Sequence, residues 1–204
     1  MKMRVVMGCV AVGVLLAGCS LFRGGAEPDL TYVLRAAPAA DGPPAVTGVL
    51  SVLRPAVQPG LDLDRIALVR ANNELHYYAS SRWGETLPRV LSSLIVESLA
   101  GAQGFDTVVA AERAAVGSDY ELLLTVRRFE AEEAGSGAPT AQVKIECLLA
   151  AGNPRRVLGR CDTEISEPAA ANRMGEIVAA LERAAQKAIA EIRTKAVAAA
   201  RASK

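Results

Sequence analysis

The chain has 204 residues, of which 51% are hydrophobic, 22% charged and 4% aromatic, and its 23 Lys and Arg residues nearly balance its 22 Asp and Glu residues. This length and hydrophobic content are typical of one globular domain and exclude extensive disorder. The balanced charge argues against a nucleic-acid partner, because neutralising phosphates requires a clustered surplus of basic side chains.

The N-terminus combines a short basic segment with an apolar run. Lys2 and Arg4 precede an apolar run of 14 residues, which ends at Cys19. This arrangement is typical of a secretory signal peptide. A membrane-spanning helix needs about 20 apolar residues, so the run is too short for a permanent span. We therefore expect residues 1–18 to be removed as a signal peptide.

The end of the apolar run reads LAGC, from Leu16 to Cys19, and resembles the bacterial lipobox. Small residues suit the lipoprotein signal peptidase, and a cysteine thiol accepts the diacylglyceryl group as a thioether. Cys19 is therefore the predicted lipidation site. Acyl chains such as palmitate would hold the protein on a membrane, because each buried methylene adds about 0.8 kcal/mol. Ser20 is not the aspartate that retains Gram-negative lipoproteins on the inner membrane, which implies the outer membrane, facing the periplasm.

A tether over residues 19–29 and a single domain over residues 30–198 are expected to follow. Period-two alternation and turn residues predict strands around residues 30–34, 49–53, 66–70, 75–79, 108–109 and 120–126. Between the fourth and fifth of these strands, apolar residues from Leu87 to Leu99 recur at helical spacing and predict an amphipathic helix that ends near Gly101. The acidic stretch from Glu130 to Pro139 is interpreted as a hairpin loop with solvated charges.

Cys147 and Cys161 are the cysteines left beside Cys19 once the signal peptide is removed. Alternation predicts a strand over 141–149 and a following strand in which Val157, Cys161 and Ile165 share one face. If the hairpin is centred near Pro154, the two cysteines lie opposite one another, within disulfide reach. The other interpretation, two buried reduced thiols, stays open.

The last predicted element is a second amphipathic helix from Met174 to Ile192, with Arg193 and Lys195 near its end, followed by a C-terminal tail over 199–204. Two helices with single apolar faces and many short strands predict an α+β fold. We expect a mostly antiparallel sheet with both helices packed on one face.

A specific family resemblance lies in the segment LDLDRIALVRANNELHYYASSRWGETLPRVLSSLI, which begins at Leu61. The segment resembles the ABC-type transport auxiliary lipoprotein family through these elements: the strand pair with Arg65, Ile66, Asn73, Glu74 and Tyr77, the Arg82-Trp83 pair, and Leu87-Pro88 at the helix start. Tyr32 with Leu34, and the stretch from Leu50 to Pro55, also fit, so the resemblance covers Leu30 to Ile192. Gly84 and Thr86 depart from the alanine and proline of the family pattern.

The resemblance implies a function. Members of this family accompany transport systems built from an ABC transporter and substrate-binding MCE (mammalian cell entry) proteins, including the paraquat-inducible type. A role in lipid traffic between the inner and outer membranes follows from the resemblance, with this lipoprotein as an accessory subunit. The MCE-domain protein and its ABC transporter are then the expected partners, together with the membrane that holds the anchor. A bound lipid and a homo-oligomer are further options that the sequence leaves open.

Tyr78, Arg82 and Trp83 are the candidate partner-binding residues, because aromatic and Arg side chains are enriched at interfaces. The alternative is that Trp83 covers the sheet edge and Arg82 pairs with a carboxylate. His76 is the only histidine and has no nucleophile or acid partner at a catalytic spacing, and no GxxxxGK phosphate loop occurs. We therefore expect no enzyme activity, no metal site and no cofactor beyond the lipid on Cys19.

Three functions are compatible with these features. The first is a docking subunit of an MCE-type lipid transport complex, whose partner binds an exposed strand edge or the Arg82-Trp83 region. The second is a stand-alone lipoprotein that holds a lipid in an apolar pocket between helix and sheet. The third is an outer-membrane assembly lipoprotein for lipopolysaccharide or a barrel protein. The first is the prediction.

Overall fold

The computed structural model describes residues 29–38, 42–101, 103–113, 117–133, 135 and 137–203. The predicted signal peptide, Cys19, Ser20 and the tether up to residue 28 lie outside the described residues. Within those residues, no helix has the combination of length and apolar content that crossing a membrane requires.

Strands and helices both contribute to the domain, and the α+β class is confirmed. The strands are β1 (Leu30–Tyr32), β2 (Val46–Val52), β3 (Ala56–Val57), β4 (Arg65–Val69), β5 (Leu75–Trp83), β6 (Phe105–Ala110), β7 (Tyr120–Glu132), β8 (Thr140–Ala151), β9 (Arg156–Arg160) and β10 (Thr163–Pro168). The helices are α2 (Leu87–Ala100), the short 3-10 helix η1 (Ala111–Arg113) and α3 (Met174–Ala202).

All the described strands join one sheet, and β7 is its central strand. The order is β1-β5-β4-β7-β2-β6, with β8 on the other side of β7 and with β9 and β10 paired to β8. β7 runs antiparallel to β8 but parallel to β2, β3 and β4. The orientation of the sheet is therefore mixed, with these parallel pairs beside the antiparallel β7–β8, β8–β10, β8–β9 and β4–β5 pairs. Parallel neighbouring strands need a crossover connection. β2 and β6 are such neighbours, and the chain that connects them includes α2.

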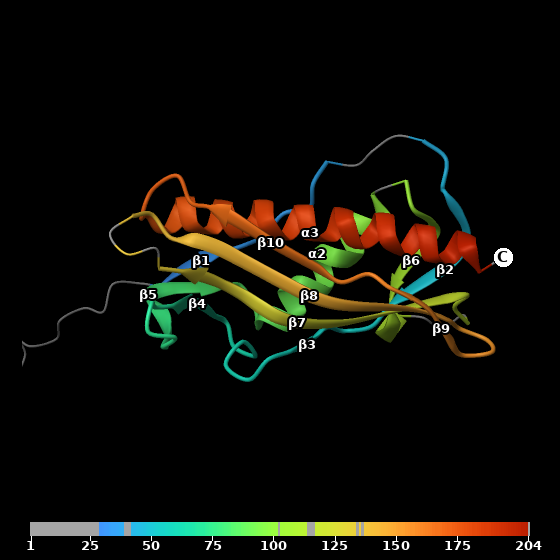
Figure 1. The fold of residues 1–204 in the computed structure, drawn as a ribbon, viewed down its shortest axis with the longest axis horizontal. Coiled ribbons are helices and arrows are strands. Elements are labelled where there is room, and N and C mark those ends of the chain that lie inside the picture. Colours follow the sequence, from blue (N-terminus) through green and yellow to red (C-terminus); the bar gives the residue numbers. More distant parts are fainter. Residues whose placement is uncertain are drawn as a thin grey trace, which may run out of the picture.

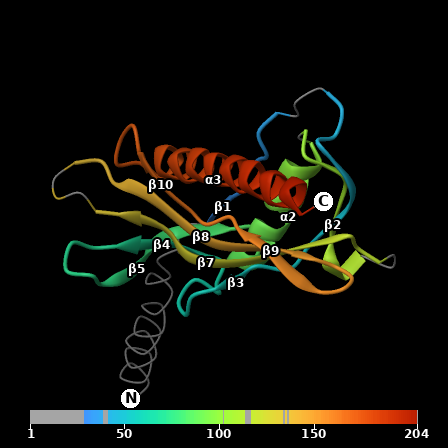
Figure 2. The same cartoon turned by 45° about the vertical axis from the view of Figure 1, so that its right-hand side comes forward.

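The two long helices pack on one face of the sheet, as their one-sided apolar stripes predict. Figures 1 and 2 show α3 lying along β8 and β10 with α2 beside it, and α2 contacts α3, β2 and β6. The α2 bounds follow from Pro88 at its start and Gly101 after its end. The α2 side chains facing the core are Leu87, Leu91, Leu94, Ile95 and Leu99.

α3 is longer than predicted. It continues past Lys195 to Ala202, through most of the stretch expected to be a tail. Ala196 and Ala200 are buried, so the apolar stripe extends into the last turns of the helix. Alanine has the highest helix propensity, which explains how the alanine-rich end stays helical with little bulk to bury.

The polar hairpin regions also differ from the prediction. β7 continues through Glu132, so only the second part of the stretch from Glu130 to Pro139 forms the turn.

The single strand expected around Cys161 is divided into β9 and β10. Val157 is 62% exposed and does not share the inner face with Cys161. The irregular β8–β9 register between Leu149 and Ala150 shifts the alternation and explains this difference.

Candidate functional site

Arg82 forms two ion pairs at the start of the domain. Its guanidinium Nη2 donates to Asp29 Oδ2 at 2.6 Å, and its Nη1 lies 3.7 Å from Asp64 Oδ2. The Arg82 side chain remains half exposed. Arg82 thus pairs with carboxylates, as the alternative interpretation expected, and connects the first described residue to the loop before β4.

Trp83 lies in the core. Its side chain is 2% exposed, and its ring meets that of Phe129 on β7 at a centroid distance of 6.1 Å and an interplanar angle of 66°. An aromatic pair in this edge-to-face geometry stabilises the fold beyond the area that it buries. The ring of Trp83 is therefore not available as a contact surface, which corrects the expectation that it anchors a partner.

The tyrosines of β5 are half buried and serve the packing around this strand. The Tyr77 hydroxyl donates to Gly60 O at 2.9 Å, and the Arg65 guanidinium lies 4.5 Å from the Tyr77 ring centroid in a cation–π contact. Burial raises the pKa of the Tyr78 phenol, and the nearby Glu133 carboxylate adds to this effect. Tyr78 is neutral at physiological pH and offers only part of its ring to solvent.

His76 pairs with a neighbouring carboxylate. Its Nε2 lies 3.0 Å from Glu74 Oε2, and this hydrogen bond lowers the pKa of Glu74. Among the described residues, no group of three or more His, Cys, Asp and Glu side chains is placed to hold a metal ion.

Cys147 and Cys161 are joined in a disulfide, with their Cα atoms 4.8 Å apart. Cys147 on β8 and Cys161, just after β9, also share a backbone hydrogen bond of 2.9 Å. Asp162 interrupts the strand here, because its Oδ1 accepts from the Cys147 N–H at 2.9 Å. That hydrogen bond is the main reason that the pKa of Asp162 is lowered. Both cysteines are 1% exposed, so the disulfide lies within the hydrophobic core of the domain.

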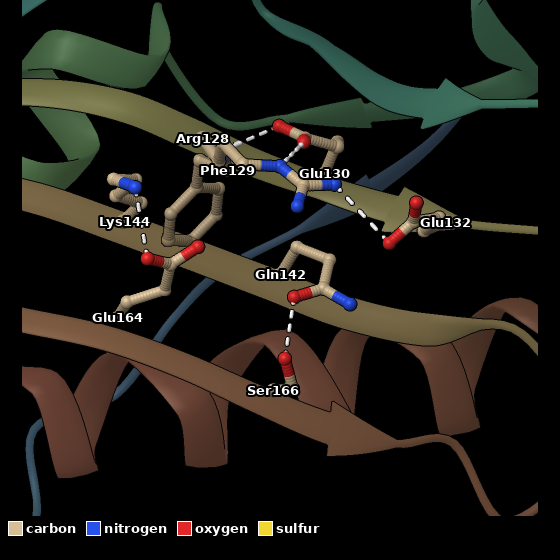
Figure 3. A network of polar contacts seen from close by, with 8 residues as sticks. All are labelled: Arg128, Phe129, Glu130, Glu132, Gln142, Lys144, Glu164 and Ser166. Carbon is tan, nitrogen blue, oxygen red and sulfur yellow. Dashed lines mark hydrogen bonds and ion pairs between the residues drawn. The ribbon is translucent and has the colours of Figure 1, made fainter. Parts of the chain in front are cut away.

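The glutamates of β7 form a network instead of a solvated loop. Glu130 is only 5% exposed, and its carboxylate accepts from Arg128 Nε at 2.6 Å and from the Phe129 N–H at 2.7 Å. Arg128 also donates to Glu132 at 3.2 Å. Figure 3 shows this network beside the Lys144–Glu164 and Gln142–Ser166 pairs that connect β8 with β10. The hydrogen-bond partners of Glu130 come from its own strand, so its carboxylate helps to hold the local conformation of β7.

An open hollow lies along α2 and was not predicted. It is a groove of about 680 Å³, and we call it the α2 groove. Its lining residues come from the end of β1, from the start and outer side of α2, and from η1; they include Tyr32, Val33, Gly84, Glu85, Arg89, Val90, Ser93, Val96, Glu97 and Arg113. Ion pairs border it, with Arg54 at 3.3 Å from Glu112 and Arg89 at 3.4 Å from Glu85.

A sequence signal for the α2 groove does exist. Arg89, Ser93 and Glu97 recur every four residues along the predicted helix, opposite its leucines, and therefore share one outer face. The hollow itself depends on segments far apart in the chain, namely residues 32–34, 54 and 110–113. Single-sequence periodicity contains no information about such contacts, which is why the groove was missed.

Comparison with known proteins gives a family and a fold. Residues 32–193 match the family model described as ABC-type transport auxiliary lipoprotein component. No curated protein matches the chain. The crystal structure of protein XCC0632 from Xanthomonas campestris, of family DUF330, is 23% identical with a TM-score of 0.75, over 85% of this chain and 98% of that chain. A crystal structure of an uncharacterised protein is 18% identical with a TM-score of 0.65, over 82% and 98% of the two chains.

Proposed function

The chain belongs to the ABC-type transport auxiliary lipoprotein family, and from this premise we propose that it is a non-catalytic docking subunit of an MCE-type ABC transport system that moves lipid between the inner and outer membranes. The observation that carries the proposal is the family match, which includes β2 to β10, α2 and most of α3. The matched region is thus most of the folded domain, and not one motif within it.

In this proposal, the membrane anchor is the lipid on Cys19. Cys19 lies ten residues before Asp29, the first described residue. A lipid anchor of more than one acyl chain gives stable attachment without a spanning helix. Ser20 supports the outer membrane as the site of attachment, with the domain in the periplasm.

The α2 groove is the docking surface that we propose for the MCE-domain partner. It begins directly after Trp83, at Gly84 and Glu85, and so lies next to the region that the sequence singled out. Its lining mixes valine side chains with Arg and Glu, and a surface of apolar and charged groups of this kind suits a protein partner. Arg89 and Ser93 project from α2 with exposed side chains, so they are available for contact.

The stand-alone lipid-binding alternative is less well supported. It requires an apolar pocket between helices and sheet, but the described side chains in that layer are shielded from solvent. Leu91, Leu94 and Ile95 of α2 and Ala184 and Ala188 of α3 are at most 2% exposed. The α2 groove lies on the outer side of α2 and contains charged residues, which is unfavourable for burying an acyl chain.

Co-purification with two matched variants tests the proposal. The lipidated protein is recovered from its native envelope in mild detergent, and the proteins that accompany it are identified by mass spectrometry. Ser93→Arg places a bulky charge in the α2 groove, and Ala198→Arg places the same charge on an exposed position of α3 outside the groove. We expect an MCE-domain protein or its ABC transporter with the wild type and with Ala198→Arg, and its loss with Ser93→Arg.

One result would contradict the docking role, and another would contradict only the proposed surface. Recovery of a barrel protein without any ABC or MCE component would favour the assembly-lipoprotein function. Recovery of the MCE protein in equal amounts with both variants would leave the docking role in place but exclude the α2 groove as its surface.

A further inference from the structure

The residues on either side of Cys161 are held against the C-terminal half of α3. A Cβ atom on Gly159 would lie only 2.8 Å from the Cβ of Ala199, so strand and helix approach closely at this point. On the other side of the cysteine, the Thr163 hydroxyl donates to Glu191 Oε2 at 2.7 Å. Cys161 therefore lies between two contacts with α3 that are about two helical turns apart.

The strand register places these contacts on the face of the sheet that contains the disulfide. Gly159 is opposite Leu149 of β8, and Thr163 is opposite Ile145. Leu149 and Ile145 are buried, and Cys147 lies between them in the same alternating pattern. Successive residues of a strand point to opposite faces, so Cys147 faces the same side as its two buried neighbours. In Figure 1, the C-terminal half of α3 and β9 lie at the same end of the molecule.

A third contact lies between the first two. Lys195 of α3 donates from Nζ to the backbone O of Asp162 at 2.5 Å, directly after the second cysteine. Ala196 of the same helical turn is 2% exposed, and Cys147 and Cys161 are each 1% exposed. The C-terminal half of α3 thus shields both sulfur atoms from solvent.

Thiol–disulfide chemistry needs direct contact with sulfur. A thiolate attacks a sulfur of another disulfide, and a mixed disulfide forms before the new bond closes. When Cys147 and Cys161 become bonded, their thiols give up two protons and two electrons in total. The disulfide of the oxidant accepts both and becomes two thiols. The oxidant must therefore touch a cysteine that the folded domain covers.

We propose that the Cys147–Cys161 bond forms before the C-terminal half of α3 docks, by exchange with an external disulfide compound or disulfide protein. Docking of α3 then shields the bond from reductants. The reaction that must supply the folded domain is thus a thiol–disulfide exchange on a chain in which β8 and β9 are still uncovered. This inference does not depend on the docking role proposed above. It also gives Gly159 a function, because a side chain there would hold α3 away.

Refolding of the reduced protein tests which step comes first. The purified mature chain is unfolded in urea with a reductant and then diluted, either directly into oxidised glutathione or into buffer to which oxidised glutathione is added only after refolding. Remaining thiols are alkylated at timed intervals, and mass spectrometry of the Cys147 and Cys161 peptides gives the bonded fraction. We expect bond formation to be slower by about tenfold or more when the oxidant is added late, because it must wait for local opening of α3.

Circular dichroism of the reduced, refolded chain completes this test. Equal oxidation rates in the two procedures, with a reduced chain that is folded, would overturn the inference. A reduced chain that does not fold without the bond would support it, because oxidation then necessarily precedes docking.

Native-state reduction tests the cover itself. Folded, oxidised protein is exposed to dithiothreitol without denaturant, and the bond is followed by the same alkylation. Gly159→Val forces a side chain against Ala199, whereas the control Ala198→Val adds bulk on the exposed side of α3. We expect Gly159→Val to be reduced faster than the wild type by about tenfold or more, and Ala198→Val to resemble the wild type.

Equal reduction rates in the wild type and Gly159→Val would contradict a protective role of α3. If Gly159→Val does not fold, Thr163→Val replaces it, because this substitution removes the hydrogen bond to Glu191 and nearly keeps the side-chain shape. Thr163→Val should also be reduced faster than Ala198→Val, and equal rates for these two would again overturn the inference.

Discussion

Trp83 on β5 reaches across β4 to pack edge-on against Phe129 on β7, and both side chains are 2% exposed. The two residues of the family-like Arg82-Trp83 pair therefore lie on opposite sides of the strand and have different roles. Trp83 fixes β5 to the central strand of the sheet, and Arg82 on the surface pairs with the carboxylates of Asp29 and Asp64.

Replacement of Trp83 by alanine is expected to destabilise the fold. Removing a buried Trp side chain leaves a cavity next to Phe129 and lowers the free energy of unfolding by about 3–5 kcal/mol. Trp83→Phe keeps part of the ring contact and should cost less. Urea denaturation followed by circular dichroism measures both variants. An unchanged unfolding midpoint for Trp83→Ala, together with loss of the partner, would mean that Trp83 contacts the partner directly.

The sequence predicted the elements with regular periodicity well. The leucines of α2, its Pro88 and the following Gly101 led to almost the observed bounds, and the β4–β5 hairpin around Asn73 is confirmed. The strand pair β7–β8 is confirmed as well, with Leu124 opposite Cys147. These features depend on neighbouring residues, which a single sequence contains.

The sequence predictions fail where the alternation of inward and outward side chains along a strand is interrupted. Ser80 has a φ of 50°, and the β4–β5 register shifts between Arg65 and Ala67. The inner face of β5 therefore changes, which places Trp83 in the core. In β7, a second register shift between Val126 and Arg128 precedes the buried Glu130. Strand irregularities of this type depend on tertiary pairing and have no clear signal in one sequence.

The buried carboxylate of Glu130 is expected to give a distinct pH dependence. Burial raises its pKa above the ordinary value of 4.5, although Arg128 and the Phe129 N–H oppose the shift. The folded state then binds the proton more tightly than the unfolded state. The resulting stability is fully present below pH 4.5 and is lost as the pH rises through the raised pKa.

Chemical denaturation from acidic to neutral pH tests this expectation. The unfolding free energy of the wild type relative to Glu130→Gln should fall as the pH rises. Glu164→Gln is the matched control on the same sheet, because the Lys144 hydrogen bond lowers the pKa of Glu164. Its contribution is present above pH 4.5 and is lost on acidification, so the opposite slope is expected. Parallel pH profiles for the two variants would contradict the raised pKa of Glu130.

The disulfide makes a prediction for the mature protein. Its cysteines are separated by 14 positions, and closing a loop of about this length stabilises a protein by about 3 kcal/mol. Reduction should lower the unfolding free energy by this amount in the wild type and leave a Cys147→Ala, Cys161→Ala variant unchanged. A thiol assay on the denatured, unreduced protein should detect no free cysteine. Detection of two free thiols would mean that the pair is reduced in the native envelope.

Lipidation at Cys19 is expected to depend on that one thiol. Metabolic labelling with a lipid precursor should mark the wild type and leave Cys19→Ala unmarked, because no other side chain in the lipobox accepts the diacylglyceryl group. The variant should also leave the membrane fraction. Continued labelling of Cys19→Ala would exclude the lipobox interpretation.

Site-specific photo-crosslinking in the native envelope tests the docking role most directly. A photoreactive amino acid replaces Ser93 in the α2 groove or, as the control, Ala198 on the exposed side of α3. We expect an adduct between position 93 and an MCE-domain protein, and no such adduct from position 198. An adduct of position 93 with a barrel protein alone, or adducts with the MCE protein from position 198 only, would contradict docking through the α2 groove.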